Sequence, residues 1–159
     1  MNLHNTNAEL YIPDGATEEQ ALSRTTDLCI AAHQDDIEIM AYAPIVQCYG
    51  QANRWFTGVT VTDGAGSPRS GIYADYTNED MKRIRAKEQK SAAEIGKYAT
   101  QFLLAYKSVE VKDPHNQALI DELGSIILRC APGTLYTHNM ADKHDTHVAV
   151  ALNVIRALR

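Results

Sequence analysis

Two clusters of polar residues, each placed after a short strand-like run, carry the side chains that could do chemistry in this sequence. The first is His33-Gln34-Asp35-Asp36, and it follows the apolar residues 29–32. His33 and Asp36 are three positions apart, so a helical turn brings both side chains to one point. Imidazole and carboxylate suit zinc or a similar divalent ion, and a catalytic zinc site has three protein ligands and one open position. This cluster therefore offers two ligands and lacks a third.

The second cluster lies near the other end of the chain and offers the missing ligand. His138, His144 and His147 fall within ten residues. An isolated histidine is more often a surface residue than a ligand, and either aspartate of the first cluster would alone be read as a helix N-cap. Three histidines within one cluster, together with the histidine and aspartates that follow another strand, favour a metal site instead. Asp35 is offset from the expected ligands, so it is free to act as a general base on a metal-bound water, whose pKa the ion lowers.

Four strand-like runs alternate with helical patterns and must position these clusters. The first predicted strand begins at Asp27, and the other three cover residues 55–62, 102–106 and 134–137. Helical spacing continues after Asp36 and recurs over residues 77–98, 113–131 and 148–158. This alternation predicts an α/β fold with a mainly parallel sheet flanked by helices. We expect the strand order 3-2-1-4, in which the first and fourth strands are neighbours and both clusters lie at one carboxyl edge.

The composition sets broad limits on the class of protein. The 159 residues, 45% of them hydrophobic, suffice for one domain with a sizeable core. A formal net charge of −5 without a basic tract gives no electrostatic reason to expect nucleic acid binding. No apolar run has the length of a membrane span, and the N-terminus lacks a signal pattern. The three cysteines have no C-x-x-C spacing and predict reduced thiols in a cytoplasmic protein.

Two segments outside the alternation receive a plain interpretation. Residues 1–26 are polar and lack clear periodicity, so we expect an N-terminal extension on the surface or at an interface. The glycine-rich residues 63–68 follow the second strand. They match no nucleotide-binding fingerprint and are expected to form a flexible loop beside a pocket.

The two clusters also resemble the signatures of a known family. Residues 32–38, Ala-His-Gln-Asp-Asp-Ile-Glu, resemble the Ala-His-Pro-Asp-Asp-x-Glu signature of the PIG-L (LmbE-like) family of zinc-dependent N-deacetylases. Residues 144–147, His-Asp-Thr-His, are similar to the second signature of that family, His-x-x-His. The resemblance implies a Rossmann-like fold and an activity that removes acetyl groups from N-acetylglucosamine-type sugars or their conjugates.

The resemblance also implies roles for particular residues. By position in the two motifs, His33, Asp36 and His147 would bind Zn²⁺, with Fe²⁺ as an alternative ion. Asp35 would be the general base, and His144 would stabilise the developing oxyanion and assist the leaving amine. Arg85, in an Arg-x-x-Glu pattern on the long helix, matches an arginine that contacts substrate in family members. An arginine three residues before a glutamate on a helix is, however, more often a solvated ion pair.

Two departures from the family pattern affect these expectations. Gln34 replaces the proline of the first signature, which is expected to loosen the turn without removing a reactive group. Asp142 lies two residues before His144, where some members carry a tyrosine implicated in catalysis. The identity of the catalytic acid is therefore open at this point.

Three functions remain to be distinguished. The leading hypothesis is a metal-dependent hydrolase that removes an N-acetyl or related N-acyl group from a small amino sugar or sugar conjugate. The alternative is a carbohydrate- or metabolite-binding module on the same scaffold without turnover, although such a module would not need Asp35 as a base. A structural zinc site is a third interpretation, but structural sites favour four ligands and cysteine, and neither cluster contains a cysteine.

The extent of the resemblance, residues 27–159, predicts a deacetylase domain that is shortened at its C-terminus. In this family the chain continues after the corresponding helix with further strands. Without them the fourth strand would be a sheet edge with unpaired backbone groups. We therefore expect a homo-oligomer formed through that edge, or a partner segment that covers it, and a substrate pocket that is open on one side. The alternative is that the N-terminal residues 1–24 cover the edge.

Overall fold

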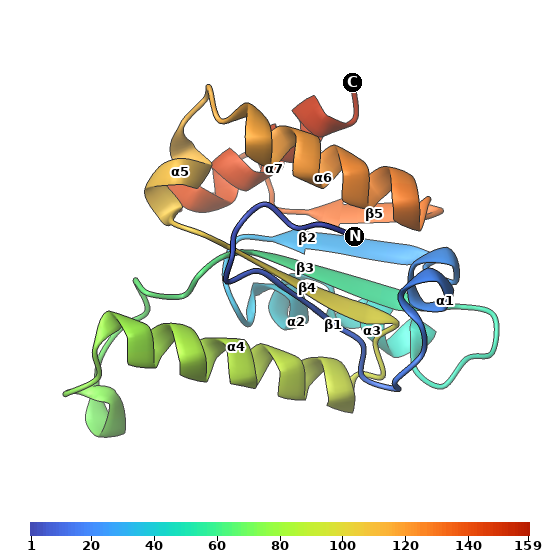
Figure 1. The fold of residues 1–159 in the computed structure, drawn as a ribbon, viewed down its shortest axis with the longest axis horizontal. Helices are drawn as coiled ribbons and strands as arrows, with labels where there is room; N and C mark the ends of the chain where they lie inside the picture. The colour runs from blue at the N-terminus through green and yellow to red at the C-terminus, as the bar shows by residue number, and fades with distance from the viewer.

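The computed structural model describes residues 1–159 as one five-stranded sheet with helices on both faces (Figure 1). The strands are β1 (Glu9–Tyr11), β2 (Asp27–Ala31), β3 (Phe56–Thr62), β4 (Thr100–Tyr106) and β5 (Thr134–Thr137). The helices are α1 (Glu18–Ser23), α2 (Asp36–Met40), α3 (Tyr42–Cys48), α4 (Asn78–Ile95), α5 (Ser108–Lys112), α6 (Gln117–Cys130) and α7 (Asp145–Ala157), with a 3₁₀ turn, η1 (Gly71–Tyr73). No helix has the length and apolar character that a membrane span requires.

The strand order is β1-β4-β3-β2-β5, which confirms a mainly parallel sheet but differs from the predicted 3-2-1-4. The difference is β1, which pairs antiparallel with β4 through Leu10 and Phe102. The four predicted strands keep the predicted sequence among themselves, as β4-β3-β2-β5. A strand of three residues has too few positions to show an alternating pattern, so residues 1–26 gave no sign of it. Part of the predicted extension thus belongs to the sheet.

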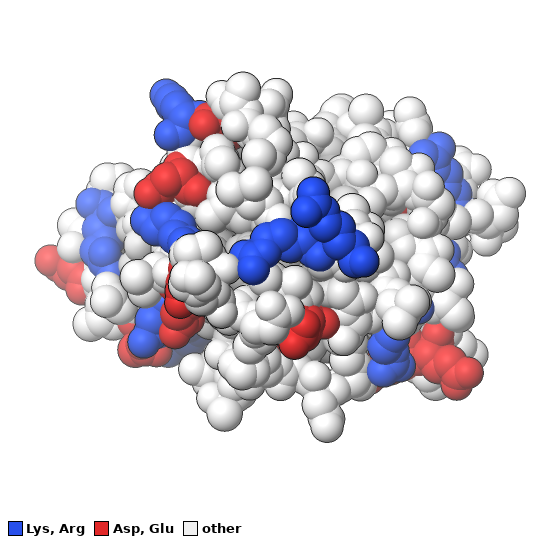
Figure 2. All heavy atoms as spheres, turned by 90° about the horizontal axis from the view of Figure 1, so that it is seen from above, with Lys and Arg blue, Asp and Glu red and all other residues white.

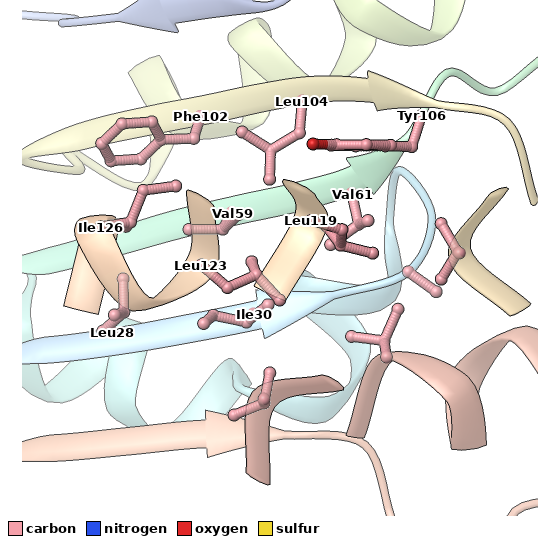
Figure 3. Packing of buried hydrophobic residues seen from close by; sticks show 14 of the residues in the cluster. Leu28, Ile30, Val59, Val61, Phe102, Leu104, Tyr106, Leu119, Leu123 and Ile126 are labelled. Carbon is pink, nitrogen blue, oxygen red and sulfur yellow. The ribbon is translucent and has the colours of Figure 1, made fainter. Parts of the chain in front are cut away.

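The buried strands are apolar on both faces because helices cover both faces of the sheet. On one face Leu28 and Ile30 of β2 pack with Leu123 and Ile126 of α6 in the larger core cluster (Figure 3). On the other face, residues of β2 pack with α2, α3 and the end of α4, among them Ala31. This continuous burial explains why β2 and β3 could be predicted from their apolar and β-branched composition.

Helix α7 begins at Asp145, three residues before the predicted start at residue 148. His144 is the N-cap residue with extended backbone angles, and the carboxylate of Asp145 in the first turn is favourable near the positive end of the helix dipole. The helical spacing in the sequence begins only at residue 148, because residues 145–147 are polar. The correction places His147 inside the first turn of α7, where the helix fixes its direction.

Two other predicted helix boundaries are also wrong. The helix expected from residue 113 begins at Gln117, because Asp113 accepts a hydrogen bond from the His115 N–H at 2.9 Å and forms a separate turn. Helix α5 precedes that turn and was not predicted. The helix after Asp36 is divided at Ala41 into α2 and α3. None of these changes moves the first polar cluster away from the end of β2.

Charged residues on the face that carries α6 and α7 are of mixed sign. Figure 2 shows blue and red groups scattered over a mostly uncharged surface. Blue groups adjoin near the centre of this side, but they form no broad basic face.

A buried ion pair anchors the start of β2. The Asp27 side chain is 3% exposed and accepts hydrogen bonds from Arg54 Nε at 2.9 Å and Nη2 at 2.8 Å, and from the Tyr136 hydroxyl at 3.1 Å. These contacts, with Arg54 the largest, lower the pKa of Asp27 from 3.8 to about 2. Because the pKa of Asp27 is lowered on folding, the ionised side chain stabilises the fold at pH values above its ordinary pKa of 3.8. This contribution is lost as the pH falls towards about 2.

We therefore expect Asp27→Asn to lower the free energy of unfolding by on the order of 1–2 kcal/mol near neutral pH, since the Arg54 end of the pair is partly in water. The difference from the unchanged protein should shrink as the pH falls through the acid range. Urea unfolding at a series of pH values measures it, with the exposed Asp121→Asn as the control. A difference that is the same in acid and at neutral pH would contradict the ion-pair explanation.

Strand β5 is one edge of the sheet and pairs only with β2, and the three-residue strand β1 is the other edge. Its unpaired backbone groups are a template for another strand. We expect the protein to self-associate through β5, so light scattering should give a mass above 17.6 kDa that increases with concentration. A monomer mass at every concentration would rule this out.

Candidate metal centre

The first polar cluster forms a tight turn at the carboxyl end of β2. Asp35 has a left-handed backbone conformation with φ 79°, which aspartate tolerates better than most residues. Its backbone N–H donates to Gln89 Oε1 at 3.0 Å, which holds the turn against α4. The turn starts α2 at Asp36, and the backbone N–H of His33 donates to Asp36 Oδ2 at 2.7 Å. The side chains of His33 and Asp36 are thereby brought to the same side.

The second cluster meets the first because β5 lies next to β2 in the sheet. The loop after β5 leads into α7, whose first turn carries His147. Parallel neighbours end at the same edge of a sheet, so the clusters are adjacent although they are far apart in sequence. The structure therefore brings together all three residues that were predicted as ligands.

Three side-chain atoms form a nearly equilateral triangle. His33 Nδ1 lies 3.2 Å from Asp36 Oδ2 and 3.2 Å from His147 Nε2, and His147 Nε2 lies 3.3 Å from Asp36 Oδ2. A tetrahedral zinc ion with bonds of about 2.0–2.1 Å needs ligand atoms about 3.3 Å apart. Two imidazole nitrogens and one carboxylate oxygen at this spacing therefore fit a divalent ion of the zinc type.

His138 offers a second combination of groups, with Asp36 and His147, but its ring is engaged elsewhere. Its Nε2 accepts the Ala32 N–H at 2.8 Å, and its ring stacks on His147 with centroids 4.0 Å apart. Burial lowers the pKa of His138 to about 4, so the ring is neutral. We conclude that His138 supports His147 from one side and contributes no free electron pair from Nε2.

His144 lies on the open side of the triangle. Its ring stacks on His147 with centroids 4.4 Å apart and meets the ring of His33 edge-on at 4.9 Å. The side chain is 50% exposed, so it can reach a ligand in the adjoining cavity. His33, His144 and His147 also have nitrogen atoms close enough to hold an ion together.

Asp35 and Arg85 form an ion pair in the wall of a separate cavity of about 150 Å³, and neither residue lines the cavity that contains His33 and His144. Arg85 Nη2 donates to Asp35 Oδ2 at 2.8 Å and to the Gln34 carbonyl at 2.7 Å, while Nη1 donates to Glu88 Oε2 at 2.6 Å. The expected pair of Arg85 and Glu88 on one helix is thus present. The contact with Asp35 joins α4 to the end of β2, and the Asp35 side chain is 61% exposed.

Gln34 corrects one of the expectations from the sequence. Its side chain is buried, and Nε2 donates to the Thr62 carbonyl at 3.1 Å. The residue that replaces proline therefore ties the turn to the end of β3 and does not loosen it. The amide of glutamine supplies a donor that a proline ring lacks.

Three contacts within the site were missed from the sequence, two made by Asp142 and one made by Gln89. Asp142 Oδ2 lies 3.0 Å from His147 Nδ1, and Asp142 Oδ1 accepts the His144 N–H at 2.9 Å. The hydrogen bonds from His144 and His147 lower the pKa of Asp142 to about 2. The Asp-x-His spacing could have indicated the turn with His144. Neither the contact with His147 nor that of Gln89 with Asp35 has a local signal, because each depends on packing.

A polar cavity of about 330 Å³ adjoins the triangle. Its wall includes His33, Gly64, Gly66, Ser67, Lys112 and His144, and no large hydrophobic side chain contributes to it. A larger cavity of about 450 Å³ lies across Gln34 and Thr62, but none of the predicted ligands lines it. We place the candidate site in the smaller cavity because the histidines and the glycine-rich loop meet there.

Comparisons with known proteins identify a family and a fold for this chain. Residues 28–158 match the family model described as PIG-L, GlcNAc-PI de-N-acetylase. A search of curated proteins found no match.

Solved structures show the same fold at low sequence identity. N,N'-diacetylchitobiose deacetylase from Pyrococcus horikoshii, solved with an inhibitor, has a TM-score of 0.70 at 17% identity over 91% of this chain and 53% of its own. The 4-carboxy-2-hydroxymuconate hydratase GalB from Pseudomonas putida has a TM-score of 0.68 at 18% identity, over 84% of this chain and 55% of its own. A conserved protein from Thermus thermophilus, TT1542, has a TM-score of 0.66 at 18% identity, over 83% of this chain and 54% of its own. The chain thus spans about half the length of each.

Proposed function

The chain belongs to the PIG-L family, GlcNAc-PI de-N-acetylase, and on this premise we propose that it is a metal-dependent hydrolase that removes an N-acetyl or related N-acyl group from an amino sugar or sugar conjugate. One observation carries the proposal. The triangle of His33 Nδ1, Asp36 Oδ2 and His147 Nε2 has the spacing of a tetrahedral divalent site. The carboxylate of Asp35, in the same turn, is paired with Arg85.

His33, Asp36 and His147 would hold the ion, with Zn²⁺ as the leading candidate and Fe²⁺ as the alternative. A bound divalent ion supplies acidification of a water molecule and polarisation of an amide carbonyl. Asp36 brings the negative charge to this set. Burial opposes its ionisation, but hydrogen bonds from His33 outweigh burial and lower the pKa of Asp36.

The other residues have separate roles in the proposed reaction. Asp35 accepts the proton of the attacking water, a role that requires its side chain to turn from Arg85 towards the cavity at the triangle. Arg85 holds the carboxylate of Asp35 in a charged pair and is a candidate for contact with substrate, since a sugar hydroxyl could replace one of its hydrogen bonds. His144 lies at the cavity wall, where it can donate a hydrogen bond to the oxyanion and pass a proton to the leaving amine.

The cavity supports a sugar-like substrate. Its lining is polar, and glycine at position 66 leaves room for a ligand to approach the backbone. The only cation in the lining, Lys112, already pairs with Asp145 at 2.9 Å. The name of the hydratase GalB suggests a substrate with several carboxylates for that enzyme, and such a substrate would find no unpaired lysine or arginine in this lining.

A panel of N-acetylated amino sugars, followed by mass spectrometry and acetate assay on zinc-loaded protein, tests the proposal. We expect loss of one acetyl group from at least one compound. Binding of a panel member without acetate release would favour the alternative, a carbohydrate- or metabolite-binding module. Hydration of an unsaturated carboxylate without amide cleavage would favour the chemistry named for GalB.

Replacement of His144 tests the division of roles among the histidines. We expect His144→Ala to retain zinc and to lower kcat by about 10²–10³-fold, the loss typical of a group that stabilises an oxyanion. Zinc content by emission spectroscopy and acetate release measure the two effects. Loss of zinc from this variant would make His144 a ligand and contradict the proposed role.

A further inference from the structure

One carboxylate in the loop before α7 contacts both of the histidines of the second signature. Asp142 Oδ1 accepts the backbone N–H of His144 at 2.9 Å, and Oδ2 lies 3.0 Å from the ring nitrogen Nδ1 of His147. The side chain is 30% exposed, so it is accessible to water but fixed at both oxygens. Since an ionised carboxylate only accepts hydrogen bonds, Nδ1 of His147 must be the protonated nitrogen of that ring.

This contact determines which nitrogen of His147 faces the site. With the proton on Nδ1, the free electron pair is on Nε2, the atom 3.2 Å from His33 Nδ1 and 3.3 Å from Asp36 Oδ2. The rings of His138 and His144 stack on His147 at 4.0 and 4.4 Å, with interplanar angles of 11° and 18°. Stacking fixes the plane of the ring, and Asp142 fixes its rotation and tautomer within that plane.

We infer that Asp142 is a positioning residue that fixes His147 in the tautomer and orientation required to bind the metal, an inference that rests on the proposed function. Hydrogen bonds to the outer nitrogen of a ligating histidine orient the ring and raise its basicity. Both oxygens of Asp142 are occupied in this role. The carboxylate that stands where some relatives carry a tyrosine therefore supports a ligand, and His144 is left as the proton donor of the site.

Two substitutions separate the contact with His147 from the turn with His144. Asp142→Asn keeps the size of the side chain but has one acceptor oxygen, so it cannot serve both partners as acceptor. Asp142→Ser retains a short acceptor for the His144 N–H and is too short to reach His147. Asp113→Asn is the matched control, because Asp113 accepts the His115 N–H at 2.9 Å in the same Asp-x-His turn, away from the triangle.

We expect Asp142→Asn and Asp142→Ser to weaken zinc binding by about 10–100-fold, the loss typical of such outer partners, while Asp113→Asn keeps the affinity of the unchanged protein. A competition titration with a chromophoric chelator measures the affinity. Thermal melts of the metal-free variants confirm that each variant is folded.

The second measurement does not require metal or activity. In the metal-free protein, ¹⁵N NMR of the histidine rings, at a pH where they are neutral, should show His147 protonated at Nδ1. In Asp142→Ser it should show a mixture with the Nε2-protonated tautomer. Unchanged zinc affinity in both variants, or an unchanged tautomer of His147 in Asp142→Ser, would overturn the inference. Failure of the proposed metal site is recognised separately, because zinc affinity would then be unaffected by His147→Ala.

Discussion

Asp35→Asn is expected to lower kcat by about 10²–10⁴-fold, the range typical of general base catalysis, and to leave the zinc content unchanged. Asp35 lies outside the triangle of ligand atoms, and its side chain is 61% exposed. Asparagine tolerates the left-handed backbone at this position, and its oxygen can still accept from Arg85. The substitution therefore removes the base without removing the turn. Acetate release and zinc content of the same preparation measure the result.

The control for this experiment is Asp121→Asn on the exposed side of α6, which should change neither quantity. A loss of zinc from Asp35→Asn would mean that Asp35 is a ligand and that we assigned the two neighbouring aspartates wrongly. Retention of the full turnover number would exclude Asp35 as the base.

Asp36→Ala is expected to weaken zinc binding by more than about 100-fold, beyond the loss typical of outer partners, and to abolish turnover. Asp36 Oδ2 is the oxygen of the triangle, and it also accepts the backbone N–H of His33 at 2.7 Å. Its removal takes away one ligand, the negative charge of the set and the contact that orients His33. A zinc titration of the metal-free protein measures the affinity.

Asp35→Asn is the matched control for the titration, since it changes the adjacent carboxylate in the same turn. Zinc affinities that are equal in Asp36→Ala and the unchanged protein would contradict the assignment. Equal losses in both variants would show that the two carboxylates share the ion.

The parts of the fold that could be predicted from the sequence are those whose signal is local. Strands β2 and β3 are buried on both faces and, apart from Asp27 at the start of β2, consist of apolar or β-branched residues. Helix α4 begins where Thr77 and Asp80 form a capping box. Strand β1 has no such signal, because its three residues join the sheet only by pairing with β4. The start of α7 was misplaced because its first turn is polar.

The candidate site shows the same division. The spacing of His33 and Asp36 indicated two converging ligands, and the turn at Asp35 produces that convergence. Spacing alone could not choose among three histidines for the third ligand. The resemblance to PIG-L proteins singled out His147. The contact between Asp142 and His147 could not be predicted, because it depends on the path of the loop after β5.

The identity of the ligands is the central claim, and an anomalous difference map from crystals of the zinc-loaded protein tests it most directly. We predict one peak at the carboxyl edge of the sheet, bonded to His33 Nδ1, Asp36 Oδ2 and His147 Nε2, with Asp35 and His144 outside bonding distance. A peak held by His138, or no peak between the two clusters, would contradict the account.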